Sequence, residues 1–305
     1  YRGANGPIDT PNQPWSIDNE GQMNAWPMEE ALVDYVAIGT EGEGAGTYDF
    51  NIISDTSIAI NAASISSYNE FENNEASVTT GWHAIEFLLW GQDNTLPSEN
   101  LAGQREFTDY TIADNADRRG QYLTVVTDLL INDLLDLVNT WNTGGTYRTI
   151  FDNLEEDVAI AQFVFGAFFI AGDELSGERM FVAIDSDGGI GGLGQEDEHS
   201  CFSDNTHRDI ILNFLGCKNV LLGSYTKVDG TVVSGTSILS VIKEKDSNVA
   251  NQLEAKTNAI VTSTEAIEVP FDLALTSDQT NIENTISALD EFSLLIADAK
   301  LAITE

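Results

Sequence analysis

A histidine and a glutamate lie three residues apart in an otherwise apolar run, GWHAIEFLLWG, at residues 81–91. At helical pitch, side chains three apart share one face, so His83 and Glu86 should project together. The rest of this helix is apolar nearly all round, which predicts that it is buried. Imidazole and carboxylate groups can bind iron or zinc. Two ligands do not complete a zinc site, so a hydrogen-bonded core pair is the alternative.

The two other histidines lie in one polar segment, QEDEHSCFSDNTHRD, at residues 195–209. If folding brings this segment against His83, the two together could form a mixed nitrogen and oxygen metal site. A polar loop that caps helices is the alternative. A zinc-peptidase motif H-x-x-E-H is incomplete, because Phe87 stands where its second histidine would be. The candidate side chains of the segment are Glu198, His199, Ser200, Asp204 and His207.

The elements that must position these residues are helical by pattern. Apolar residues recur at spacings of three and four over 121–141 and again over 282–296, which predicts core-facing bundle helices. A more polar helix is predicted over 237–256. At 27–37 a proline and two glutamates suit a helix N-terminus. Strand patterns are scarce, apart from one hairpin predicted at 225–233 around an Asp-Gly turn. The predicted fold class is therefore all-α, with two helical-bundle domains packed together.

Glycine-rich loops mark the organisation of the chain. NTGGT at 142–146 lies between long helical patterns and predicts a boundary between domains 1–143 and 144–305. DSDGGIGGLGQ at 185–195 matches neither a phosphate loop nor an EF-hand, which predicts a flexible surface insertion. The most apolar run, 158–172, is shorter than the ~20 residues of a membrane span and predicts a buried core helix instead.

The net charge excludes some partners. With 13 Lys and Arg against 50 Asp and Glu, it is −37. Such a field repels nucleic acid and anionic membrane surfaces and concentrates cations. Solubility in a salty environment is the plainer explanation of the charge. Arginines that persist in so acidic a chain are expected to be structural or ligand clamps, since guanidinium pairs well with carboxylates. These are Arg118, Arg119, Arg179 and Arg208.

Cys201 and Cys217 leave two alternatives open, a disulfide in an exported protein or two buried free thiols. The sequence opens without a basic, apolar signal segment, so we expect that an export signal was removed.

Longer motifs carry a family resemblance. GWHAIEFLLWGQD resembles the G-x-H-x-x-E signature of the imelysin family. The likeness extends to about residue 225 and is greatest to the branch called iron-regulated protein A. It also rests on NGPID at 5–9, NAWPMEEALVDYV at 24–36, RRGQYL at 118–123, GERM at 177–180 and EDEHSCFSDNTH at 196–207.

The resemblance implies an exported bacterial protein, periplasmic or lipid-anchored, with its site at the interface of two helical bundles. Two departures are noted: a leading helix and any anchor are expected to be missing, and the glycine-rich insertion is longer than usual. His83 and Glu86 hold the signature positions. The rest of the implied site is Glu178, Arg179, Glu198, His199, Ser200, Asp204 and His207.

Three functions follow as hypotheses. The first is iron or metal uptake by binding a metal ion, or an iron-bearing ligand such as haem, without turnover, with a membrane transporter as a possible partner. The second is a zinc-dependent metallopeptidase, in which Glu86 or Glu198 would activate water. The family was first labelled as a metallopeptidase family. The third is a non-catalytic structural or interaction protein. The metal, iron or zinc, is not fixed by ligand type.

Overall fold

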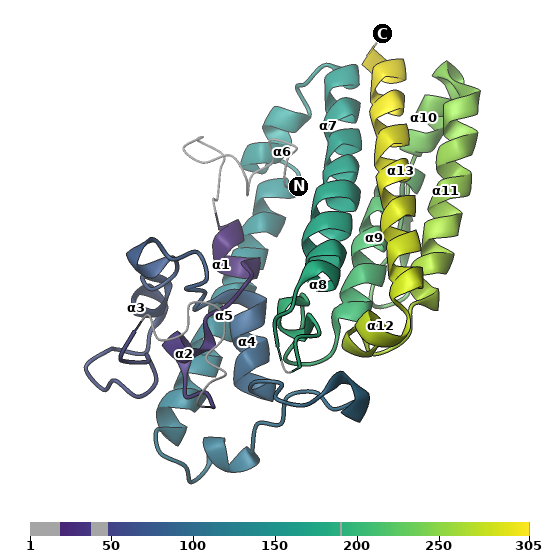
Figure 1. The fold of residues 1–305 in the computed structure, drawn as a ribbon. Coiled ribbons are helices and arrows are strands. Elements are labelled where there is room, and N and C mark those ends of the chain that lie inside the picture. The colour runs from purple at the N-terminus through teal and green to yellow at the C-terminus, as the bar shows by residue number, and fades with distance from the viewer. Residues whose placement is uncertain (1–18, 38–47, 190, 305) are drawn as a thin grey trace.

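The computed structural model describes residues 19–37, 48–189 and 191–304. Helices dominate these residues, and the only strands among them form one hairpin, so the predicted all-α class is confirmed. Figure 1 shows long helices standing side by side toward the C-terminus and shorter helices joined by loops toward the N-terminus. The NGPID motif at 5–9 lies outside the described residues.

The N-terminal half is built around one long helix, α5, against which α4 packs. The other helices of this half are short, so it is less regular than the predicted bundle. Its α-helices are α1 (Glu20–Asn24), α2 (Glu30–Val33), α3 (Ala62–Ser66), α4 (Gly81–Trp90), α5 (Ala116–Trp141) and α6 (Thr146–Phe151). Its 3-10 turns are η1 (Phe71–Asn73), η2 (Pro97–Glu99) and η3 (Phe107–Tyr110).

The C-terminal half is a helical bundle whose long members pack on one another. Its first helix is continuous through α7 (Glu156–Phe169), the π-helical η4 (Ile170–Phe181) and α8 (Val182–Asp185). The remaining elements are η5 (Gln195–Asp197), α9 (Thr206–Leu222), β1 (Ser224–Thr226), β2 (Val232–Ser234), α10 (Ile238–Lys245), α11 (Ser247–Ala266), α12 (Phe271–Ser277) and α13 (Gln279–Thr304).

Several sequence predictions are confirmed in this half. The stripe of α13 is buried where the pattern placed it, with Ile282, Leu289, Phe292 and Ile296 wholly inside. The hairpin forms with Tyr225 opposite Val233. The helix predicted over 237–256 is broken, because Asp246 ends α10 and its carboxylate caps the start of α11.

The helix that begins near residue 27 and the apolar run 158–172 also differ from prediction. α2 holds only residues 30–33, since the chain turns extended again at Asp34. The apolar run does not stop near residue 172, because π-helical turns carry it on to Asp185. The resulting helix, Glu156–Asp185, is long and apolar enough to cross a membrane by length and composition, a test that a core helix also passes. It packs against α13 and α9.

Two apolar cores underlie the two halves, and one segment crosses between them. The first core contains residues of α4 and α5, and the second contains residues of α7, α9, α11 and α13. Cys201 and Phe202, from beyond the predicted boundary at 143, belong to the first core. Cys217 belongs to the second, and both thiols are free and buried. The chain therefore inserts part of its second half into the core of the first.

Buried and half-buried arginines hold the loops of the N-terminal half. Arg119 donates to both oxygens of Asp34 at 2.6 and 3.0 Å. Arg105, which the sequence analysis did not single out, donates to Asp34 at 2.8 Å. Arg118 donates to four backbone carbonyl groups between residues 52 and 58. The clamp role expected of Arg118 and Arg119 is confirmed, whereas Arg208 lies exposed on α9.

Candidate functional site

Helix α4 presents His83 and Glu86 toward the C-terminal half. The helix begins at Gly81, whose φ is +85° and where a Cβ would lie 2.3 Å from the Met23 carbonyl oxygen. Glycine is therefore required for α1 to approach this closely. His83 is 2% exposed, and its ring lies 4.8 Å from the Trp26 ring. The signature glycine thus fixes where the histidine sits.

His199 comes from the turn that precedes α9. Its Nδ1 lies 2.9 Å from Oδ2 of Asp209, on the first turn of α9. Ser200 donates its hydroxyl to the same oxygen at 2.5 Å. Asp209 was part of the polar segment noted in the sequence but was not predicted as a site residue. Its carboxylate is what orients the His199 ring.

The two histidine-bearing segments converge. The His83 and His199 rings lie 4.7 Å apart, centroid to centroid, and are nearly perpendicular. Glu86 accepts hydrogen bonds from the Ser203 amide at 3.0 Å and from the Ser203 hydroxyl at 2.6 Å. The juxtaposition on which a shared site depends is therefore present.

In each imidazole ring, one nitrogen lies beside a carboxylate and the other has no hydrogen-bond partner among the described residues. His83 Nδ1 lies 3.4 Å from Oε2 of Glu86, and His199 Nδ1 faces Asp209. Because a carboxylate only accepts, these partners favour the neutral tautomer with its proton on Nδ1 and its lone pair on Nε2. Both Nε2 atoms are buried, and neither has a hydrogen-bond partner among the described residues. Buried polar atoms without partners are uncommon in proteins and call for an explanation.

The charge states suit a donor role for His199. Burial lowers the pKa of His199 below its ordinary value, and the nearby His83 ring adds to this, although the Asp209 hydrogen bond opposes it. Burial would raise the pKa of Asp209, but the hydrogen bond and charge of His199 outweigh burial and lower it. Near neutral pH the pair is therefore a neutral imidazole beside a carboxylate. That is the arrangement in which metal-ligating histidines are usually held.

A buried ion pair on the π-helix lies at the same site. Arg179 donates to Oε2 of Glu174 at 2.6 Å. Residues five apart lie about 140° apart around an α-helix, but a π-helix pairs residue i with i+5. The sequence analysis took Arg179 from the GERM motif and did not find Glu174, which α-helical spacing would not have paired with it. The Nε of Arg179 is buried and has no hydrogen-bond partner within the described chain.

These groups line a cavity of about 790 Å³ between the two halves, which we call the histidine cavity. Its polar wall is formed by His83, Glu86, Glu174, Arg179, His199, Ser200, Ser203 and Asp209, among others. Its apolar wall includes Trp82, Leu89, Trp90, Leu134, Ile170 and Leu212. The volume is within the range of small-molecule pockets and far exceeds that of a single ion.

The apolar wall corrects the expectation that α4 is buried all round. Trp82, Leu89 and Trp90 are 52%, 47% and 39% exposed. They are exposed because they line an open cavity between the halves instead of packing into a core. Large apolar side chains gathered at a hollow of this kind are typical of a binding surface.

The remaining predicted residues do not line this cavity. Glu178 is exposed on η4, outside the lining. His207, on the first turn of α9, has its Nδ1 3.1 Å from the Asp204 carbonyl oxygen. Glu198 is wholly buried, and Asp204 is 8% exposed. Both belong to a group of carboxylates that also includes Asp93 and Asp272. Burial is the largest cause of the raised pKa of Glu198, and the charges of the three aspartates raise it further.

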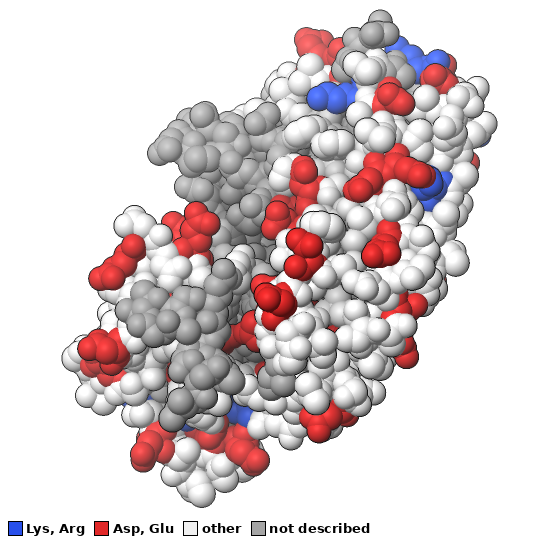
Figure 2. Space-filling view, viewed as in Figure 1, with Lys and Arg blue, Asp and Glu red and all other residues white. Residues whose placement is uncertain are grey.

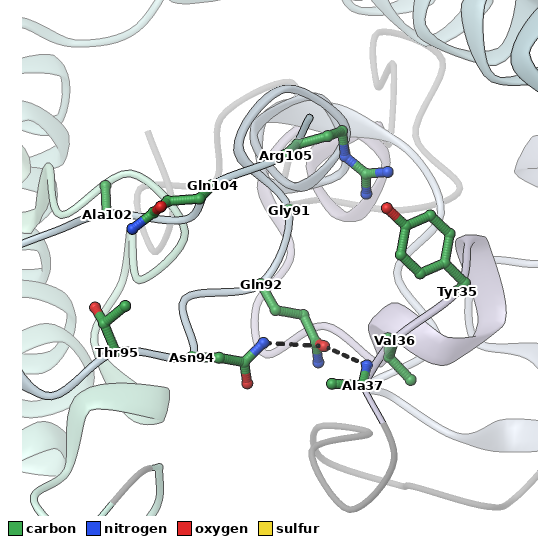
Figure 3. Close-up of a pocket in the computed structure, with 10 residues that line it drawn as sticks. All are labelled: Tyr35, Val36, Ala37, Gly91, Gln92, Asn94, Thr95, Ala102, Gln104 and Arg105. Atoms are coloured by element: carbon green, nitrogen blue, oxygen red, sulfur yellow. Dashed lines mark hydrogen bonds between the residues drawn. The ribbon is translucent and has the colours of Figure 1, made fainter. Parts of the chain in front are cut away.

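A second cavity of about 350 Å³ lies in the N-terminal half and is lined by other residues (Figure 3). The Gln92 side-chain oxygen accepts from the Ala37 amide at 2.9 Å, and both residues line this cavity. Tyr35 and Arg105 form another part of its wall, and both are engaged with Asp109. No histidine is among its lining residues.

Acidic side chains are spread over the described surface of the face in Figure 2, and few lysines or arginines accompany them. The strongly negative composition is therefore distributed over this face and not confined to one patch. A field of this sign raises the local concentration of cations and of cationic complexes.

The chain matches one family model, and its fold matches a solved structure. The imelysin family, peptidase family M75, matches residues 3–295. The fold is similar to a crystal structure described as an iron-regulated protein A precursor from Parabacteroides distasonis. The TM-score is 0.69 at 16% identity, over 94% of this chain and 75% of that one. No functionally curated protein matches the chain significantly.

Proposed function

The chain belongs to the imelysin family, and we propose that it is an exported protein that binds an iron-bearing ligand between its two halves during iron uptake, without chemical turnover. The observation that carries this proposal is the pair of bare Nε2 atoms on His83 and His199. Two buried ring nitrogens without partners, on side chains that line one cavity, call for a Lewis acid or a donor from outside.

The site favours a ligand that brings its own donor atoms over a bare ion. Within the described ranges, the only group of three ligand side chains close enough to share an ion is Asp93, Asp204 and Asp272. The histidine pair therefore lacks a third protein ligand at short range. A chelated iron or a haem supplies the other ligands itself, and the apolar wall of the cavity would cover its organic part.

Arg179 would hold an acidic group of such a ligand. Its guanidinium already pairs with Glu174 but keeps a buried Nε–H without a hydrogen-bond partner in the described chain. Guanidinium groups bind carboxylates through paired N–H donors. A ligand carboxylate in the cavity would pair with the Arg179 guanidinium while the iron meets the histidines.

The zinc-peptidase hypothesis is less well supported by the same groups. It would require a third zinc ligand and a free carboxylate as base. Glu86 already accepts two hydrogen bonds from Ser203, and Glu198 lies among the aspartates instead of in the cavity. The purely structural hypothesis fits poorly with bare Nε2 atoms, since a satisfied core pair would leave none.

The test is a binding titration of the chelator-stripped chain with haemin and with ferric citrate, beside the variants His83→Ala and His199→Ala. We expect one equivalent to bind, with an affinity loss of at least about 100-fold in each histidine variant. Far-UV circular dichroism should be unchanged. Glu178→Gln is the matched control, and its exposed side chain should leave affinity within about twofold.

Unchanged binding in both histidine variants would refute the assignment. Cleavage of a protein substrate that a chelator stops and zinc restores would instead support the peptidase.

A further inference from the structure

Three aspartates from distant parts of the chain meet outside the histidine cavity. Asp93 follows α4, Asp204 precedes α9, and Asp272 lies in the first turn of α12. One carboxylate oxygen of each lies within 4.8 Å of the others. We call this group the acidic cluster. It joins the N-terminal half, the crossing segment and the C-terminal bundle at one point.

The acidic cluster contains buried oxygens that no donor satisfies. Asp272 is 1% exposed and Asp204 8% exposed, and Oδ1 of each makes no hydrogen bond with a described residue. Glu198 beside them is wholly buried, and only the Thr206 hydroxyl is close enough to lower its pKa against the effect of burial. Native proteins rarely leave buried carboxylates in this state, because their desolvation is costly.

The carboxylates of the acidic cluster repel one another, which agrees with the geometry of a cation site. Burial, followed by the charges of Asp272 and Asp93, raises the pKa of Asp204 to about 7. Burial raises the pKa of Asp272 to about 6, and the charge of Asp93 contributes. The pKa of Glu198 is raised well above its ordinary value, first by burial and then by Asp272 and Asp204. Burial is thus the largest influence on each group, and other carboxylates raise each pKa further, although the Leu273 backbone amide partly opposes this at Asp272.

We propose that Asp93, Asp204 and Asp272 bind one hard divalent cation of the Ca²⁺ class. The donors are all oxygens, which suit Ca²⁺ or Mg²⁺ and not the softer ions that the histidines suit. Ca²⁺ binds oxygen at about 2.3–2.6 Å, so two of its ligands lie at most about 5 Å apart. The spacing of the three aspartates meets that limit.

The surroundings of Asp93 are built to hold its carboxylate in place. The Thr95 amide and hydroxyl donate to Oδ1 at 3.0 and 2.8 Å, and the buried Gln195 amide donates to Oδ2. The neighbouring Gln92, Asn94 and Thr95 line the cavity of Figure 3, whereas Asp93 is not among its lining residues. Each oxygen of a carboxylate has a further lone pair for a cation.

A cation here would position part of the histidine cavity. Asp204 directly follows Ser203, which donates to Glu86, and His199 lies five residues earlier on the same turn. Asp204 itself has a φ of +53°, a strained conformation that a bound cation would help to hold. This role is independent of the ligand proposed for the histidine cavity.

The experiment is a Ca²⁺ titration by calorimetry on the full chain after chelator treatment, in about 0.5 M KCl so that diffuse attraction to the acidic surface is screened. We expect one saturable site, weakened at least about 100-fold by Asp272→Asn. The site should persist in Glu254→Gln, which removes an exposed charge from α11, and in His83→Ala. No saturable site, or a site that survives Asp272→Asn, would overturn the proposal.

Thermal unfolding distinguishes loss of the site from loss of the fold. Without divalent cations, Asp272→Asn should melt no lower than the wild type at about pH 8, because it removes a repelling charge. Added Ca²⁺ should raise the melting temperature of the wild type and not of the variant. A variant that melts lower without Ca²⁺, and responds to Ca²⁺ as the wild type does, would make the cluster a hydrogen-bonded structural network. Failure of haemin binding in His83→Ala is a separate result.

Discussion

The histidine cavity and the acidic cluster share one short segment, residues 198–204, but they differ in chemistry. In the cavity each imidazole is paired with a carboxylate, and the bare atoms are nitrogens. In the cluster carboxylates face one another, and the bare atoms are oxygens. Nitrogen donors suit iron and zinc, whereas oxygen donors suit Ca²⁺ and Mg²⁺. Adjacent residues of one acidic, histidine-containing motif therefore serve two environments with different preferences.

The largest effect that tests this comparison should come from Phe202→Ala. Phe202 is 1% exposed and packs its ring 5.3 Å from Phe87 and 5.8 Å from Trp26. Removing it should lower the free energy of unfolding by about 3–5 kcal/mol in urea denaturation. Because Phe202 anchors the shared segment, haemin and Ca²⁺ affinities should both fall. Weakening of only one affinity would mean that the two regions are positioned independently. Phe107→Ala, at a side chain 78% exposed, is the control.

A smaller effect, confined to one region, is expected from Asp209→Asn. The variant removes the charge that orients His199 and that also accepts from Ser200. Outer carboxylate partners of histidine ligands are worth about 10–100-fold in affinity, so haemin binding should weaken by that factor. Ca²⁺ binding by calorimetry should not change. An equal loss of haemin and Ca²⁺ affinity would instead indicate that the two regions form one site. Asp173→Asn, at an exposed position on η4, is the matched control.

The smallest effect concerns Glu29, a buried carboxyl group outside both regions. Its side chain accepts from Asn74 at 3.1 Å, and burial raises its pKa from 4.5 to about 7. The folded chain therefore keeps this proton longer than the unfolded chain. The contribution of protonated Glu29 to the free energy of unfolding is fully present below about pH 4.5 and is lost as the pH rises through about 7.

Glu29→Gln should remove that loss, since glutamine can accept the same hydrogen bond. It should raise the free energy of unfolding by about 2 kcal/mol at about pH 8 and much less at about pH 5. Denaturation curves at the two pH values measure this, with and without Ca²⁺. The gain should be the same in both, because Glu29 lies outside the acidic cluster. A gain that Ca²⁺ abolishes would show that the two are linked.

Periodicity predicted the regular elements well and their interruptions poorly. The stripe of α13 and the hairpin around Asp229 and Gly230 follow from local patterns that burial and turn geometry impose. The break at Asp246 and the π-helical turns of η4 cannot be read from local patterns. Each lies between α-helical segments, so the surrounding sequence resembles one continuous helix. The missed pairing of Glu174 with Arg179 is a direct result, since it exists only at π-helical spacing.

The candidate site was predictable in part for a similar reason. His83 and His199 could be singled out as rare ligand types, and the contact between their segments followed only from the fold. Glu198 was grouped with His199 by sequence neighbourhood. Its backbone is extended, with φ −77° and ψ 146°, so successive side chains leave on opposite sides. Asp93 and Asp272 gave no local signal, because they meet Asp204 only through tertiary packing.

The insertion of Cys201 and Phe202 into the first core constrains how a ligand enters. Many two-lobed binding proteins admit ligands by swinging their lobes apart about a hinge. Here that motion would pull Phe202 out of contact with Phe87 and Trp26 and expose its ring to water. Burial of Phe202 therefore opposes separation of the two halves. A ligand of the proposed kind would then enter the histidine cavity past exposed side chains such as Trp82 and Trp90, whose rotations are far faster than an opening of the two halves.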